Sequence, residues 1–171
     1  MKKKYYLIAS ALFLLPTVCY AGPGFETKES IRKELISECI RGSRKEKWAA
    51  QFCECTVNQV MEKYSLNDLK AIETNPQKAE KFKKDLADAA LSKKCVKLGT
   101  IDACKGAYAR TSKGKLPEAV VLKYCNCAMD KMLEKYSPAD LVKFGRDKNK
   151  VKRIVEDTRD PECVAIIKNA M

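Results

Sequence analysis

The apolar residues of the chain recur at helical spacing. Between residues 49 and 64 they fall on one face of a helix, and polar residues fall on the opposite face. The inward face carries Ala49, Phe52, Cys53, Thr56, Val57, Val60 and Tyr64, and the outward face carries Gln51, Glu54, Asn58 and Glu62. No segment shows sustained period-two alternation or an Asn-Gly hairpin turn, so the pattern predicts an all-α protein.

The same pattern returns 72 residues further along the chain. The segment Cys53–Leu69 aligns with Cys125–Leu141, and both contain the tetrapeptide Glu-Lys-Tyr-Ser. The second inward face carries Val121, Tyr124, Cys125, Ala128, Met129, Met132 and Tyr136, and the outward face carries Lys123, Asn126, Asp130 and Glu134. We therefore predict two tandem repeats, residues 22–98 and 99–171, each of about four helices.

Each predicted repeat also has the same arrangement of cysteines, which is one cysteine, a Cys-x-Cys pair and a final cysteine. The two sets are Cys39, Cys53, Cys55, Cys95 and Cys104, Cys125, Cys127, Cys163. The final cysteines align after a deletion of four residues, and the first cysteines align if the second copy carries seven extra residues around 111–115. The repeat therefore extends over the whole cysteine framework.

Sequence signatures of helix starts occur at equivalent places in the repeats. Ser65 and Ser137 each precede an aspartate by three residues, so that the hydroxyl can cap the first turn while the acid favours the helix dipole. Asp160-Pro161 predicts a further start, because it combines a capping acid with proline at the first helical position.

The N-terminus has the three parts of a secretory signal peptide. Three lysines precede the apolar run Leu7–Leu15, and Cys19-Tyr20-Ala21 places small residues at the positions that cleavage requires. The run is well short of the roughly 20 residues of a membrane span, so we expect cleavage after Ala21 rather than a membrane anchor. Lipidation at Cys19 is disfavoured, because the preceding residues lack the pattern of a lipobox.

Cleavage changes the composition of the chain that folds. Loss of residues 1–21 removes one of nine cysteines and three lysines, which leaves eight cysteines and a net charge of +9 in place of +12. An even number of cysteines in an exported chain indicates four disulfides, because exported thiols are not kept reduced. No second apolar stretch is long enough for a bilayer, so the processed protein is not expected to be transmembrane.

Helix geometry limits how these cysteines can pair. Residues two apart lie about 200° apart around a helix axis, so Cys53 and Cys55 should not bond to each other. Each sulfur of a Cys-x-Cys pair must instead reach an outer cysteine of its own repeat. The heights of the helix ends favour one assignment over the swapped one, which stays open. The favoured pairs are Cys39–Cys53, Cys55–Cys95, Cys104–Cys125 and Cys127–Cys163.

The Cys-x-Cys pairs have two functional alternatives. A thiol–disulfide oxidoreductase needs an exposed thiol of low pKa, whereas these pairs lie mid-helix and partly on the apolar face. A copper or zinc thiolate site would use the same sulfurs, but zinc sites favour Cys-x-x-Cys and oxidation competes. The chain has no histidine, which excludes Ser-His-Asp catalysis, Cys-His catalysis and His-ligated metals. We therefore predict no catalytic residue, no cofactor and no bound metal.

Basic residues outnumber acidic ones by 34 to 22, but acids interleave with most of the basic runs. These runs are Arg41–Lys47, Lys78–Lys84, Lys93-Lys94 and Lys148–Arg153. The simpler interpretation is a set of solvated helix faces, and the sharper one is attraction to an anionic envelope component or a partner protein. Export argues against nucleic acid as a physiological ligand.

The arrangement Cys39…Cys53-Glu54-Cys55…Tyr64-Ser65…Cys95 resembles that of a loose group of small exported helical proteins of Gram-negative bacteria. The likeness covers the cysteine-bearing part of each repeat. It implies export from a Gram-negative cell and a disulfide framework, and it implies no particular activity.

Together these features predict an exported, non-enzymatic protein of the periplasm or the extracellular space. It would be a disulfide-stabilised interaction or structural module of the bacterial envelope, or a secreted factor. The alternative is a thiol–disulfide oxidoreductase, or a copper- or zinc-binding protein, that uses Cys-x-Cys.

Overall fold

The computed structural model describes residues 27–43, 49–111, 115–144, 148–157 and 159–170. All regular secondary structure in these residues is helical, which confirms the predicted all-α class. The signal peptide predicted at residues 1–21 lies outside the described residues. The helices are α1 (Lys28–Gly42), α2 (Ala49–Met61), α3 (Leu66–Ile72), α4 (Pro76–Ala90), α5 (Lys93–Thr111), α6 (Glu118–Lys135), α7 (Pro138–Phe144), α8 (Lys148–Asp157) and α9 (Pro161–Lys168).

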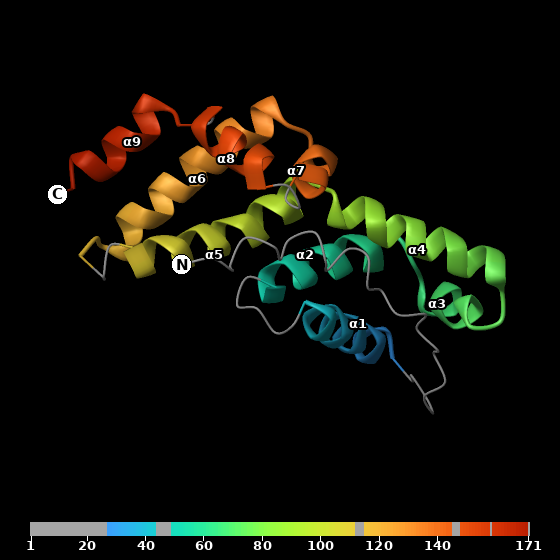
Figure 1. The fold of residues 1–171 in the computed structure, drawn as a ribbon. Coiled ribbons are helices and arrows are strands. Elements are labelled where there is room, and N and C mark those ends of the chain that lie inside the picture. Colours follow the sequence, from blue (N-terminus) through green and yellow to red (C-terminus); the bar gives the residue numbers. More distant parts are fainter. Residues whose placement is uncertain (1–26, 44–48, 112–114, 145–147, 158, 171) are drawn as a thin grey trace.

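Five of these helices, α1, α2, α5, α6 and α9, form a row in which each packs on the next (Figure 1). Neighbours in the row run antiparallel. Arg32 near the start of α1 meets Asn58 near the end of α2, and Lys97 near the start of α5 meets Asp130 in the second half of α6. Helices α3 and α4 pack together beside α2, and α7 and α8 contact each other further along the chain.

The buried apolar residues form three clusters along the row. The largest joins α1, α2, α3 and α4 around Val57, Val60 and Phe82, and the second joins α5 to α6 around Cys125 and Met129. The third lies where α2 meets both α1 and α5. The inward face predicted for residues 49–64 is confirmed, because all of its members are buried except Phe52, which is half-buried.

The predicted helix starts are also confirmed. The Ser65 hydroxyl accepts a hydrogen bond from the Asp68 backbone N–H at 3.1 Å, and the Asp68 carboxylate accepts one from the Ser65 N–H, also at 3.1 Å. The Ser137 hydroxyl likewise accepts a hydrogen bond from the Asp140 backbone N–H at 3.1 Å and so caps α7, and α3 and α7 are both seven residues long. Asp160 caps α9, with Pro161 at the first helical position.

Helix α5 runs without a break through the boundary predicted between Leu98 and Gly99. The predicted boundary is therefore not a linker between helices. A Cβ atom at Gly99 would lie 3.1 Å from the Cβ of Phe52, so glycine allows α2 and α5 to approach closely here. Cys95 and Cys104 are nine residues apart, which places them about half a turn apart around α5 and so on opposite sides of it.

Core packing makes a direct prediction for α4. Phe82 is 5% exposed, and its ring meets that of Tyr64 edge-on at 5.2 Å, so Phe82→Ala should lower the free energy of unfolding by about 3–5 kcal/mol. Urea unfolding measures this change. Leu122→Ala is the control, because Leu122 is 39% exposed and its truncation should change stability by no more than about 0.5 kcal/mol. Equal effects of the two substitutions would contradict the core assignment.

Candidate functional site

Each junction between neighbouring helices of the row carries one disulfide. The bonds are Cys39–Cys53 between α1 and α2, Cys55–Cys95 between α2 and α5, Cys104–Cys125 between α5 and α6, and Cys127–Cys163 between α6 and α9. The paired Cα atoms lie 5.4 to 5.9 Å apart, which is usual for disulfides. The eight cysteines predicted to remain after cleavage are therefore all paired, and the bonds join the five helices in series.

The Cys-x-Cys spacing is what lets α2 bond on both sides. Cys53 and Cys55 point about 200° apart around the helix, so one reaches α1 and the other reaches α5. Cys125 and Cys127 do the same for α6. Helix α5 achieves this arrangement with a nine-residue spacing instead of a two-residue one.

The sulfurs are largely removed from solvent. Cys53, Cys95, Cys125 and Cys163 are at most 1% exposed, and Cys55 is 8% exposed. The half-buried cysteines are Cys39, Cys104 and Cys127. Each disulfide therefore contains at least one fully buried cysteine, as expected for cross-links that are part of the core.

Polar groups adjoin the Cys55–Cys95 disulfide. The side-chain amide of Gln59 donates to Sγ of Cys95 at 3.2 Å and to Oγ of Ser92 at 3.0 Å, and it lies 3.7 Å from Sγ of Cys55. Ser92 also accepts a hydrogen bond from the Cys95 backbone N–H at 3.3 Å, so it caps the start of α5. One amide thus bridges α2, the disulfide and the cap of α5.

Charged groups take these places next to the Cys127–Cys163 disulfide. Lys131 corresponds to Gln59 by the 72-residue shift. Its Nζ lies 3.6 Å from a carboxylate oxygen of Asp160, which precedes Cys163 by three residues as Ser92 precedes Cys95. Hydrogen bonding from the Glu162 backbone N–H is the main reason that the pKa of Asp160 lies below its usual value, and Lys131 adds to the effect. Sequence analysis did not identify these flanking residues, although the repeat alignment already relates them.

Arg32 links the outward face of α2 to α1. Its guanidinium donates to Oδ1 of Asn58 at 2.6 Å and to the carboxylates of Glu54 at 3.0 Å and Glu29 at 3.3 Å. Two residues predicted to face outward, Glu54 and Asn58, therefore serve as contacts between helices.

Tyr64 links the end of α2 to α4. Its hydroxyl donates to the carboxylate of Asp85 at 2.6 Å, and Lys63 lies 3.6 Å from the other oxygen of that carboxylate. Burial and the hydrogen bond to Asp85 raise the pKa of Tyr64 to about 12. The same hydrogen bond holds the pKa of Asp85 below its usual value.

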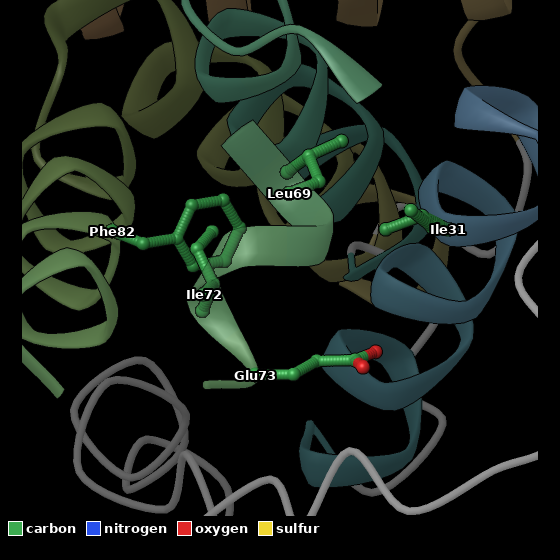
Figure 2. A pocket seen from close by; sticks show the side chains of 5 residues that line it. All are labelled: Ile31, Leu69, Ile72, Glu73 and Phe82. Carbon is green, nitrogen blue, oxygen red and sulfur yellow. The ribbon is translucent and has the colours of Figure 1, made fainter. Parts of the chain in front are cut away.

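A small cavity lies between α1, α3 and α4 (Figure 2). It is lined by Ile31, Leu69, Ile72, Glu73 and Phe82. Its volume of about 10 Å³ is near the smallest that can hold a water molecule. An organic ligand therefore does not fit into it.

Several residues of the basic runs are paired with acids. The pairs are Arg41–Glu38, Lys78–Asp68, Lys83–Glu80 and Lys152–Glu156. Arg44, Lys45 and Lys47 lie outside the described residues. Lys93 and Lys94 are exposed in the first turn of α5, which contains no acid, and neither forms an ion pair with another described residue.

In the part of the chain that the structure describes, no helix is long and apolar enough to cross a membrane. Among the same residues, no three cysteine, aspartate or glutamate side chains are grouped where they could hold a metal ion.

Comparison with known proteins gives no family for this chain. The chain matches no known protein family, no curated protein and no solved structure.

The Tyr64–Asp85 hydrogen bond predicts a pH-dependent contribution to stability. Tyr64→Phe should lower the free energy of unfolding by roughly 1–2 kcal/mol near neutral pH, because it removes the hydrogen bond that the tyrosine hydroxyl donates to Asp85. The folded protein keeps the tyrosine proton up to about pH 12, whereas an unperturbed tyrosine loses it near pH 10. The contribution is therefore complete below pH 10 and is lost as the pH rises towards 12.

Urea unfolding of the parent and the Tyr64→Phe variant between pH 8 and pH 12 measures this difference. The two curves should converge above about pH 10, because only the parent releases the Tyr64 proton on unfolding. A gap that stays constant over the whole range would contradict the assignment.

Proposed function

We propose that the chain is an exported, non-enzymatic protein built from two tandem disulfide-stapled helical repeats that share α5. In this proposal it acts as a rigid interaction or structural module of the bacterial envelope, or as a secreted factor. The observation that carries the proposal is the series of four disulfides along five helices, in which every mature cysteine has a structural partner.

Correspondences between the two halves support the repeat. In each half the first sulfur of Cys-x-Cys bonds to the preceding helix of the row and the second sulfur bonds to the following one. Helices α3 and α7 have the same length, lie 72 residues apart and begin with the same serine cap. Helix α5 is the last member of the first set and the first member of the second, so the repeats of residues 22–98 and 99–171 are joined through one continuous helix.

The chemistry of the cysteines supports an oxidising compartment. Four disulfides are typical of proteins that mature in the periplasm or outside the cell, where no thiol pool reduces them. This agrees with the signal peptide expected before Gly22. Sulfur atoms held in disulfides do not supply the thiolates that copper or zinc would need, which favours the scaffold over the metal-binding alternative.

The size of the core explains why such a protein needs cross-links. The buried residues are divided among three small clusters, and a unit of roughly 70 residues has a marginal core on its own. A disulfide that closes a loop of about 15 residues adds roughly 3 kcal/mol in the chain-entropy model. The four bonds together can therefore decide whether the row is folded.

The exposed lysines at the start of α5 support an anionic partner. Lys93 and Lys94 add two positive charges to the positive end of the α5 dipole, without an acid in that turn. We propose that an acidic envelope component or partner protein binds there, while the paired lysines elsewhere act as solvated surface.

A thiol count on mature, non-reduced protein tests the scaffold. We expect no free thiol and no stoichiometric metal, because all eight cysteines are in disulfides. Full reduction should abolish cooperative thermal unfolding or lower its midpoint strongly, as followed by circular dichroism. A reactive dithiol, bound copper, or unchanged heat resistance after complete reduction would each refute the proposal.

Charge substitutions test the partner surface. Lys93→Gln/Lys94→Gln should reduce capture of partners from an envelope extract several-fold, and capture by the parent should weaken as salt rises. Lys28→Gln/Lys33→Gln on α1 is the matched control, because it removes the same charge from exposed positions. Equal loss in both variants would show that only net charge matters.

A further inference from the structure

Cys95 lies at a position that favours the charged form of a thiol. It is the third residue of α5, whose 19 residues place the positive end of a long helix dipole at this sulfur. Ser92 caps this end with a neutral hydroxyl. A cysteine at a helix N-terminus has a lowered pKa when it is reduced.

The side chain of Gln59 adds a direct donor. Its amide nitrogen is 3.2 Å from Sγ of Cys95 and 3.7 Å from Sγ of Cys55, so it is already in place to donate to a thiolate at Cys95. Lys93 and Lys94 in the same helical turn add positive charge, and that turn contains no acid. Hydrogen bonding and charge therefore act in the same direction here.

The equivalent cysteine of the second half has different neighbours. Cys163 is also the third residue of its helix, but Asp160 and Glu162 place two carboxylates in the cap and first turn of α9. Lys131, in the position of Gln59, pairs with Asp160 rather than with sulfur. Negative charge at this end of α9 opposes a thiolate at Cys163.

The remaining cysteines lack a helix N-terminus. Cys39 is in the last turn of α1, where the dipole disfavours negative charge. The others lie in helix interiors, namely Cys53, Cys55, Cys104, Cys125 and Cys127. Burial does not favour opening of Cys55–Cys95, because both of its cysteines are buried, whereas each of the other three bonds contains one half-buried cysteine. The donor set around Cys95 does distinguish them.

We propose that Cys55–Cys95 is the redox-sensitive disulfide of the row. At equilibrium with a dithiol reductant, it is the bond that is reduced at the lowest ratio of reduced to oxidised reagent. A thiolate of the dithiol attacks Sγ of Cys55, the less buried of the two cysteines, to form a mixed disulfide, and the Cys95 thiolate leaves with the electron pair of the broken bond. The second thiol of the reductant then displaces Cys55, which takes up its proton. The reductant leaves as a disulfide, and two electrons have passed to the protein.

Opening this disulfide divides the row between α2 and α5. The first part keeps Cys39–Cys53, and the second keeps Cys104–Cys125 and Cys127–Cys163, while the chain through α4 still connects them. The inference rests on the disulfide framework of the proposed function, and it is independent of the proposed partner.

Equilibration of the full mature protein in mixtures of reduced and oxidised dithiothreitol tests this inference. After acid quenching and differential alkylation, peptide mass spectrometry reads each cysteine separately. Cys55 and Cys95 should become half-reduced at a ratio of reduced to oxidised reagent at least about tenfold lower than the other three pairs require, which corresponds to roughly 30 mV. If another pair opens first, or all four open together, the inference is overturned.

Gln59→Leu tests the cause of the difference. Removal of the donor should raise the ratio needed to open Cys55–Cys95 by roughly threefold to tenfold, the effect of losing one hydrogen bond to a charged acceptor. Lys131→Leu, at the equivalent position of α6, is the control and should leave this ratio unchanged. An unchanged ratio in Gln59→Leu would remove the physical basis of the inference.

A second measurement does not depend on the folding of that variant. Cys55→Ser leaves Cys95 as a free thiol, whose thiolate is followed by ultraviolet absorbance as the pH is raised. Its pKa should lie below the usual value of about 8.5. A pKa at or above that value would overturn the inference, while a thiol count of zero in the oxidised parent would leave the scaffold proposal intact.

Discussion

Two side chains that are two residues apart on an α-helix cannot meet, and the rest of this structure depends on that constraint. Cys53 and Cys55 must bond to different helices, so α2 is fixed between α1 and α5. The same constraint fixes α6 between α5 and α9. Because α5 carries cysteines on opposite sides as well, the two local arrangements join into one row.

Polar contacts add to this framework. Arg32 holds the outward side of α2 against α1, and Tyr64 holds its far end against Asp85 of α4. Gln59 connects α2 to the start of α5 beside a disulfide.

Sequence reasoning succeeded where structure follows from local spacing. The inward face of α2 and the serine caps of α3 and α7 depend only on residues within a few turns, and the structure has them as predicted. The continuity of α5 was not predicted, because an alignment of repeats compares residue types. It does not show whether a helix continues across the boundary between the repeats. Gly99 is the weakest helix former between Cys95 and Cys104, and one glycine costs about 1 kcal/mol.

The flanking groups escaped prediction for a different reason. The importance of Gln59 comes from Ser92 and Cys95, which are more than 30 residues away in sequence and become neighbours only after α2 packs on α5. Such a contact leaves no periodic signal, so no spacing rule identifies it.

The serial order of the cross-links also determines how the molecule would carry load. A pull between α1 and α9 passes through one S–S bond at every junction, so neighbouring helices cannot be peeled apart without covalent rupture. Helices α3, α4, α7 and α8 lie outside this path and could unravel while the tether stays intact. Under load the five cross-linked helices therefore stay connected, while the helices outside the disulfide path can unfold.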